Sequence, residues 1–426
     1  MSYFRTQNSL SLCLAFALVG ACATNDSGAP SEGSSDNGDG QDHLIDPATG
    51  DDDSDASDDP ESSGDGDAPT DEGSNADAGT DVGTAPRDGG TKPPTGGSTT
   101  TPKPDAGTGT TVADTMYVKG RLLYTPCGEK IVLRGVNHPT LYIDRAGAAL
   151  PEIAKTKANA VRLFWYANNG VSITEAEGAI KKAIENGMVP ILEMHDATGP
   201  SSWGQLSSIV SYWTSSEAVA LIKKYQHRMI VNIANEAGPE GGQNYDDFES
   251  KYKDAITKIR NAGIKVPLMI DGSGWGRDSE VLLQKGPSLV SHDPQHNILL
   301  SWHSYDSISR QQIAAVYDRA VKADLPLLVG EFANKSPNGG CGPVIDYLGI
   351  IGEAQTRDIG WLAWSWGDNN PGSVWNTDCN EFDMTSTFSF DTLQSWGKEV
   401  AVTDANSLTN KSVRPASFAK TTATCN

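Results

Sequence analysis

Two patterns of apolar residues alternate along the chain from residue 114 to residue 426. The first is a short, continuous apolar run, which is typical of a parallel strand buried on both faces. Eight such runs occur, and they predict strands over residues 131–137, 160–166, 189–195, 229–235, 267–272, 298–305, 326–332 and 360–366. Ahead of them, residues 117–133 predict a short hairpin with Cys127 and Gly128 at its turn.

The second pattern places apolar residues three and four positions apart, as in an amphipathic helix. It is clearest at residues 173–184, 248–259 and 313–321, and Gly187 and Gly263 follow the first two stretches as suitable helix ends. Strands alternating with helices predict a closed (β/α)8 barrel, the TIM barrel of the α/β class, over residues 114–426. An open sheet is disfavoured because the sequence contains neither GxGxxG nor a GxxxxGK phosphate loop.

The stretch before the barrel has a different composition. Residues 23–113 consist almost entirely of Asp, Gly, Ser, Thr, Ala and Pro. Residues 24–113 hold 21 acidic and three basic side chains, so they carry −18 of the chain's −22 charge and leave −4 elsewhere. Without large apolar side chains the stretch cannot offset the entropy of ordering, which predicts a disordered acidic linker. The nearly neutral remainder argues against a nucleic-acid partner.

Residues 1–22 predict export. Arg5 precedes the apolar run 10–19, which is too short to cross a membrane and ends on Gly20-Ala21-Cys22. This ending resembles a lipobox, so we expect a lipoprotein signal peptide with Cys22 as the lipidated residue and an anchor at the cell envelope. The alternative is an ordinary signal peptide cut near Ala21 or Ala23, which would give an extracellular protein.

Polar and aromatic residues gather where the predicted strands end, and barrel active sites lie at the C-terminal ends of strands. A single histidine or tryptophan there has an ordinary packing explanation. A cluster at nearly every strand end does not, and it predicts a catalytic cleft. Its members are Asn137, His138, Arg162, His195, Asp196, Asn235, Glu236, Asp271, Trp275, His303, Tyr305, Glu331, Trp364 and Trp366.

Glu236 and Glu331 stand out in this cluster. Each follows an apolar strand whose interior would reject a charge, so each should project into the cleft. The fourth and seventh strands face each other across an eight-stranded barrel. Two carboxyl groups facing each other over a cleft are the minimal apparatus for cleaving a glycosidic bond.

Two other functions could use part of this cluster. A metal hydrolase would use His138, His195 and His303, but the sequence has no HxH or HExxH spacing, so we expect neither a metal nor another cofactor. A non-catalytic carbohydrate-binding lipoprotein would tolerate the loss of one carboxylate, whereas Glu236 and Glu331 both persist.

The segments NIANE (232–236), HSY (303–305), VGEF (329–332) and WLAWSW (361–366) together resemble glycoside hydrolase family 5 of clan A. The resemblance covers residues 117–400. It implies that Glu236 is the acid/base and Glu331 the nucleophile of a retaining enzyme. It also implies supporting or substrate-binding roles for Arg162, His195, Asn235, His303, Tyr305 and a tryptophan of the last strand, either Trp364, which we favour, or Trp366.

Further segments resemble the bacterial endo-β-1,4-mannanases of this family: GVNH (135–138), ANAVR (158–162), HDATG (195–199) and DGSGWG (271–276). The resemblance implies endo cleavage of mannan or glucomannan by a monomer, with endo-β-1,4-glucanase as the alternative. Two departures lie near the substrate subsites, Ala237 in place of a common aromatic residue and a long loop over 367–388. His138 and Trp275 are further candidates for substrate binding, with Trp203 and Trp375 for outer subsites, whereas Trp302 and Trp361 should be structural.

Four cysteines remain after Cys13 and Cys22 are set aside, and export permits disulfides. The barrel topology ranks the three possible pairings. Cys341 and Cys379 follow the last two strands, in adjacent loops, while Cys127 and Cys425 lie near the two ends of the domain. We therefore predict the bridges Cys341–Cys379 and Cys127–Cys425.

Overall fold

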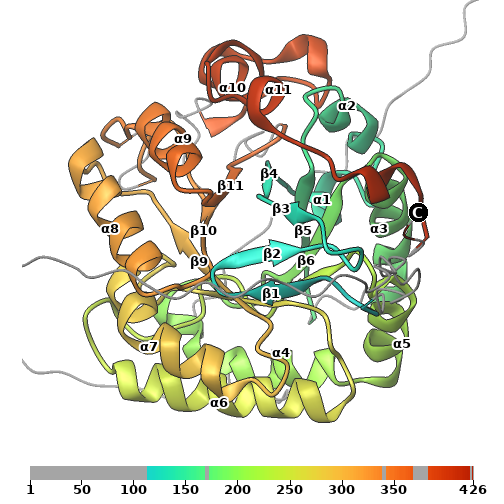
Figure 1. Ribbon diagram of the computed structural model, residues 1–426, viewed down its shortest axis with the longest axis vertical. Helices are drawn as coiled ribbons and strands as arrows, with labels where there is room; N and C mark the ends of the chain where they lie inside the picture. The colour runs from blue at the N-terminus through green and yellow to red at the C-terminus, as the bar shows by residue number, and fades with distance from the viewer. Residues whose placement is uncertain (1–112, 168–171, 338–341, 368–381, 423–424, 426) are drawn as a thin grey trace, which may run out of the picture. The chain divides into compact units, whose positions relative to one another are not determined.

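The computed structural model describes residues 113–167, 172–337, 342–367, 382–422 and 425. The predicted signal peptide and linker, together with Cys22, Cys341, Trp375 and Cys379, lie outside these residues. Eight parallel strands close into a barrel in the order β10-β11-β4-β5-β6-β7-β8-β9, and Figure 1 shows the barrel within its ring of helices. The strands are β4 (Arg134–His138), β5 (Ala160–Trp165), β6 (Val189–Met194), β7 (Ile230–Asn232), β8 (Leu268–Asp271), β9 (Ile298–His303), β10 (Leu327–Glu331) and β11 (Gly360–Ala363). The predicted (β/α)8 barrel is confirmed.

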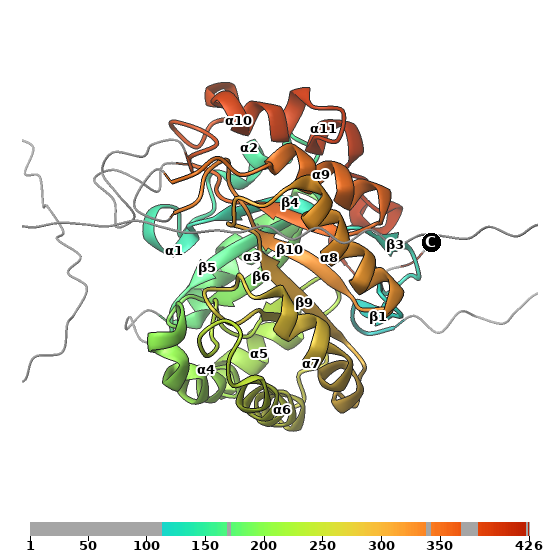
Figure 2. The ribbon, with the colours of Figure 1, turned by 90° about the vertical axis from the view of Figure 1, so that its left-hand side faces the viewer.

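Helices follow the strands and ring the barrel (Figures 1 and 2). They are α1 (Thr140–Ile143), α2 (Leu150–Ala154), α3 (Glu177–Glu185), α4 (Leu206–Trp213), α5 (Ser216–Tyr225), α6 (Tyr245–Asn261), α7 (Ser279–His292), α8 (Arg310–Lys322), α9 (Tyr347–Thr356), α10 (Ser395–Lys398) and α11 (Leu408–Lys411). The apolar spacing read in the sequence is the buried stripe of α6, where Phe248, Tyr252 and Ile259 are fully buried. Gly187 and Gly263 follow α3 and α6 with φ of 74° and 85°. Among the described residues, no helix is both long and apolar enough to cross a membrane.

The predicted strands extend too far at their C-terminal ends. The apolar run 229–235 yields a strand that stops at Asn232, and the run 360–366 yields one that stops at Ala363. The residues beyond these points remain buried under the loops that carry the site, so burial continues after the ladder of strand hydrogen bonds has ended. An apolar run therefore marks what is buried, but not where the strand pairing stops.

A small antiparallel sheet precedes the barrel and closes its N-terminal end. It consists of β1 (Tyr117–Lys119), β2 (Leu122–Tyr124) and β3 (Lys130–Ile131). The predicted single hairpin is therefore wrong in part. Cys127 and Gly128 do lie in the turn between β2 and β3, but Gly120, with φ of 59°, makes a second turn. The buried face of this sheet, with Leu123 and Ile131, packs on the first residues of the barrel strands.

The C-terminal segment is fastened to the same end of the barrel. Arg228 donates to the carbonyls of Ser417, Phe418 and Lys420, and its guanidinium lies 4.2 Å from the centroid of the Phe418 ring. The bridge Cys127–Cys425, with Cα atoms 5.3 Å apart, joins this segment to the β2–β3 turn. This pairing is the predicted one, and it is confirmed.

We expect Cys425→Ser to lower the free energy of unfolding by about 2–5 kcal/mol, because the bridge closes a very long loop in the unfolded chain. Denaturant titration without a reductant measures this loss. Cys127→Ser should cost the same amount, and the double variant no more than either single one. The catalytic rate should not change, since the cavity lies at the other end of the barrel. Additive losses in the double variant would show that the two cysteines act separately.

Candidate active site

Glu236 and Glu331 face each other at the C-terminal end of the barrel. Glu331 is the last residue of β10, and Glu236 lies in the loop after β7. Both are nearly buried, with 5% and 3% of their surface exposed. One carboxylate oxygen of each and a ring nitrogen of His303 all lie within 4.8 Å of one another. As expected from the sequence, the strand ends bring the two carboxyl groups together.

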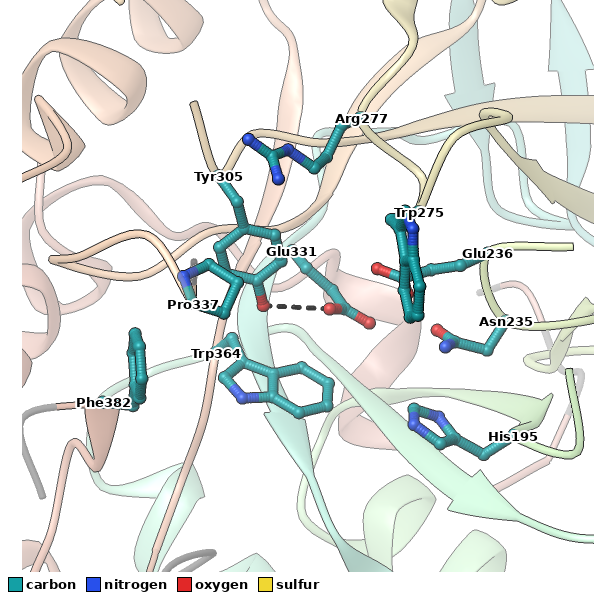
Figure 3. A pocket seen from close by; sticks show the side chains of 10 residues that line it. All are labelled: His195, Asn235, Glu236, Trp275, Arg277, Tyr305, Glu331, Pro337, Trp364 and Phe382. Carbon is teal, nitrogen blue, oxygen red and sulfur yellow. Dashed lines mark hydrogen bonds between the residues drawn. The ribbon is translucent and has the colours of Figure 1, made fainter. Parts of the chain in front are cut away.

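Three side chains hold the Glu331 carboxylate. Arg162 Nη1 donates to Oε1 at 2.6 Å, and the Tyr305 hydroxyl donates to Oε2 at 2.9 Å (Figure 3). His303 Nδ1 lies 3.5 Å from the same Oε2. Burial and the Glu331 charge raise the pKa of Tyr305, so its hydroxyl keeps the proton that it donates. Bonds to both oxygens fix the orientation of the Glu331 carboxylate.

Arg162 is fully buried, and each of its five N–H donors has an acceptor. Besides Glu331, the guanidinium donates to Asn232 at 2.7 Å, Asn137 at 3.1 Å, Asn235 at 2.8 Å and Asp271 at 3.3 Å. Burial disfavours its charge, but the surrounding carboxylates outweigh burial and raise its pKa. Arg162 therefore contributes a fixed positive charge beneath the cleft and acts through the groups that it holds.

Glu236 has a different environment. Its Oε1 lies 2.8 Å from His303 Nδ1, and its backbone N–H donates to Asp271 Oδ2 at 3.1 Å. Its φ of 47° lies in the left-handed region, which costs a non-glycine residue on the order of 1–3 kcal/mol and so needs support from neighbouring groups. Burial raises the pKa of Glu236, the His303 bond opposes this, and the Glu331 charge adds to the rise. The net result is a carboxyl group that keeps its proton to higher pH than usual.

His303 and Asp271 form a buried pair below the two glutamates. His303 Nε2 lies 3.4 Å from Asp271 Oδ2, and both side chains are fully buried. Burial disfavours a charged ring, but Glu331, Asp271 and the bond to Glu236 together raise the pKa of His303 to about 10. Burial likewise opposes ionisation of Asp271, yet His303 and Arg162 hold its pKa well below the usual range. The raised pKa favours a protonated His303, whose Nδ1 contacts both glutamates.

A cavity of about 250 Å³ opens above the two glutamates. Trp364 forms one side of it, with its ring stacked on that of Phe164 at a centroid distance of 4.8 Å. Trp275, 43% exposed, stands opposite and rests on Gly199, where a Cβ would meet the indole at 2.5 Å. Figure 3 shows the lining: His195, Asn235, Glu236, Trp275, Arg277, Tyr305, Glu331, Pro337, Trp364 and Phe382. Two flat apolar rings beside two carboxyl groups suit a sugar ring.

Most of the predicted site residues meet here. His195, Asn235, Trp275, Tyr305 and Trp364 line the cavity with the two glutamates. Arg162 and His303 lie one layer below, where they contact the carboxylates instead of the cavity. Trp302 and Trp361 are buried, as expected of structural residues.

His138 and Trp366 do not reach the cavity, which corrects their prediction as substrate-binding residues. His138 is fully buried, with Nε2 3.0 Å from Asp144 and Nδ1 3.3 Å from the Trp366 carbonyl. Trp366 is also fully buried and donates its indole N–H to the carbonyl of Phe388. The strand ends at Ala363, so the alternation that related Trp366 to Trp364 does not continue.

Trp203 and Ala237 do not line the cavity. Trp203 is 9% exposed, stacks on Phe248 and lies outside the cavity lining. Ala237 is fully buried and accepts the Tyr252 hydroxyl bond at its carbonyl, so it does not shape a subsite by contact. Both pack against α6.

Several site residues were not assigned a role from the sequence. Arg277, Pro337 and Phe382 line the cavity from loops, where no periodic pattern identifies them. Asn232 and Glu193 lie inside apolar strands. A charged residue within an apolar run is costly to bury, so the run 189–195 did carry a signal at Glu193.

The barrel and its facing carboxyl groups define the class of protein as a glycoside hydrolase, and comparison with known proteins agrees. The family model of cellulase, glycosyl hydrolase family 5, matches residues 125–370. The chain therefore belongs to glycosyl hydrolase family 5.

Within this family, the chain is similar to several mannanases. The chain is 33% identical over 294 residues to a mannan endo-1,4-beta-mannosidase of Salipaludibacillus agaradhaerens, covering 67% of this chain and 90% of that protein. It is 32% identical over 313 residues to a mannan endo-1,4-beta-mannosidase of Cellvibrio japonicus, and the match covers 71% of this chain and 69% of that protein. A beta-mannanase of Thermomonospora fusca solved with mannohexaose superimposes with a TM-score of 0.63 at 25% identity, covering 71% and 99%.

Proposed function

We propose that this glycoside hydrolase is an endo-β-1,4-mannanase that acts with retention, using Glu331 as the nucleophile and Glu236 as the acid/base. The observation that carries the proposal is the pair of carboxylate oxygens within 4.8 Å of each other at facing strand ends. Retaining enzymes place the two groups about 5–5.5 Å apart, whereas inverting enzymes need roughly 6.5–9.5 Å to admit a water. The activities named for the relatives support the choice of mannan.

In the first step, Glu331 attacks the anomeric carbon of the sugar bound over Trp364. The bond from that carbon to the glycosidic oxygen breaks, and the oxygen takes the proton of Glu236. The raised pKa of Glu236 supports the acid role, because the group must hold a proton near neutral pH. Arg162 and Tyr305 keep the Glu331 oxygens oriented for attack.

In the second step, a water enters from the side that the leaving chain has vacated. Glu236, now ionised, takes a proton from this water while the water oxygen attacks the anomeric carbon and releases Glu331. Two displacements return the original anomeric configuration. Asn235 lines the cavity beside Glu236, with its amide nitrogen 3.3 Å from the Thr198 hydroxyl, and we assign it to the 2-hydroxyl of the same sugar.

The experiment that tests this function compares reducing-sugar release from glucomannan, galactomannan, carboxymethylcellulose and xylan. We expect cleavage of the two mannans, a fast fall in viscosity that marks internal cuts, and a β-anomer as the first product by NMR. Preference for carboxymethylcellulose would favour the alternative, an endo-β-1,4-glucanase, in line with the cellulase description of the family. An α-anomer as first product would contradict the assignment of Glu331.

We further propose that residues 1–22 export the chain, that Cys22 carries lipid, and that residues 23–113 tether the barrel. The support is their sequence alone: a short apolar run before Cys22, and a linker with few large apolar side chains.

Deletion of residues 23–113 should leave the melting temperature and the activity on soluble mannan within error, because such a linker has little apolar surface to bury on the barrel. Thermal melts and initial rates measure both quantities. In the full chain, Cys22→Ser should release the enzyme from membranes into the soluble fraction. A clear drop in melting temperature after deletion would show that the linker docks on the barrel.

A further inference from the structure

Glu193 is a buried charge that the reaction described above does not use. It lies inside β6, pairs in register with Phe164 of β5 and Asn232 of β7, and is fully buried. Its Oε1 lies 2.8 Å from His195 Nδ1, while its Oε2 is buried without a hydrogen-bond partner among the described residues. A buried carboxylate with one close partner is costly, so stability does not account for it.

Glu193 helps to balance the charge of Arg162, but it does so without a hydrogen bond. Glu193 Oε1 is 3.8 Å from Arg162 Nη1, which is beyond hydrogen-bond distance. Arg162 already donates to Glu331 at 2.6 Å and to Asp271 at 3.3 Å. The close contact of Glu193 is therefore with His195.

His195 is held on two sides. Its Nδ1 faces Glu193, and its ring stacks on Phe164 at a centroid distance of 4.9 Å, with the Trp364 ring at 6.1 Å. Nε2 occupies the opposite edge of the ring from Nδ1. Because Nδ1 faces Glu193 and His195 lines the cavity, Nε2 is the ring nitrogen left to meet a sugar above Trp364.

We propose that Glu193 is a positioning residue that holds His195 by Nδ1 in its doubly protonated form, so that Nε2–H donates a hydrogen bond to a hydroxyl of the sugar bound over Trp364. The inference rests on the proposed function, because it needs a sugar in the cavity. Without the Glu193 charge the doubly protonated ring would lose a proton at lower pH, and a neutral ring that keeps its proton on Nδ1 offers Nε2 only as an acceptor.

The charges around His195 agree with this assignment. Burial disfavours the protonated ring, but Glu193 outweighs it and raises the pKa of His195. Glu331 acts in the same direction and Arg162 against it. The titratable and charged groups that face the ring from its own strand and from neighbouring elements are Glu193, Arg162, Tyr166, Glu236 and Glu331.

A double-mutant cycle on kcat/KM for mannan tests the proposal. Loss of a charged hydrogen bond to substrate predicts that His195→Ala lowers kcat/KM about 10- to 100-fold. Glu193→Gln keeps an acceptor for Nδ1 but removes the charge. The kcat/KM of Glu193→Gln divided by that of the wild type should be near one at low pH. It should fall as pH rises, because the His195 ring of the variant loses its proton at a lower pH than in the wild type. In the His195→Ala background, Glu193→Gln should cost nothing more.

The matched control is Asp144→Asn. Asp144 holds the buried ring of His138 at 3.0 Å in a similar way, but that pair lies outside the cavity. The kcat/KM of Asp144→Asn divided by that of the wild type should not change with pH. An equal cost of Glu193→Gln with and without His195 would overturn the proposal, since Glu193 would then act through another group.

Nitrogen NMR of labelled histidine in the wild-type protein gives a test that does not depend on Glu193 variants folding. The His195 signals are those lost in His195→Ala. We expect Nδ1 to be protonated at every pH, and both nitrogens to stay protonated above the pH at which a free histidine becomes neutral. A ring that is neutral at the pH of the rate measurements would overturn the proposal: protonated only at Nδ1 it could not donate from Nε2, and protonated only at Nε2 it would not donate to Glu193. If the wild type cleaves no β-glycan, the proposed function fails while this NMR result stands by itself.

Discussion

Replacing Glu331 by alanine should lower kcat on β-1,4-mannan roughly 10⁴- to 10⁶-fold, the range seen when a central catalytic group is removed from other enzymes. The reason is chemical: without this carboxylate no covalent bond to the anomeric carbon can form. The effect should be the same for polysaccharide and for activated aryl glycosides, because both need the nucleophile. Initial rates on both substrates measure it.

Azide provides the control for Glu331→Ala. A small anion can enter the space left by the carboxylate and attack the anomeric carbon from the same side. With an activated aryl β-mannoside, we expect partial recovery of rate and an α-mannosyl azide, in which the configuration is inverted. Recovery with a β-azide would mean that Glu331 is not the attacking group.

Glu236→Ala should lower the rate of mannan cleavage about 10²- to 10⁴-fold, which is the contribution of a general acid. For a substrate whose leaving group departs without a proton, the rate of the first step should fall far less. The pH profile adds a second measurement. Because the pKa of Glu236 is raised, wild-type activity should fall as pH rises through it, when the acid loses its proton. This alkaline limb should be missing in Glu236→Ala with the activated substrate.

Glu240→Ala is a suitable control for Glu236→Ala, since Glu240 lies in the same loop but is exposed and outside the cavity lining. It should keep wild-type rates on both substrates. If Glu236→Ala lost activity equally on mannan and on the activated substrate, the acid role would be wrong.

The barrel could be predicted from the sequence because each strand is buried on both faces and each helix on one, so burial leaves a readable pattern. The two glutamates could be predicted for the same reason, since each comes directly after a run that excludes charge. Strand ends could not be placed. Beyond Asn232 and Ala363 the chain stays buried while its pairing stops, and apolar composition responds to burial alone.

The direction of a side chain past the end of a strand was also beyond the sequence. His138 ends β4 and His195 directly follows β6, yet one pairs with Asp144 and is buried, whereas the other lines the cavity. The sequence does not show which partner each ring meets: Asp144 directly follows α1, and Glu193 lies in β6 itself. Glu193 is the opposite case, because its charge within an apolar run was visible and only its partner was not.

The bridge between Cys127 and Cys425 makes the barrel a covalent ring, since the bonded residues are 298 positions apart and enclose every strand of the barrel. A protease that cuts one loop of this ring opens it but releases no fragment. All ten residues that line the cavity remain on a single covalent molecule, and the two new ends are held together by the packed barrel. Two cuts, or one cut followed by reduction, are needed before any piece can leave. A single nick in one of these loops would therefore be survivable damage.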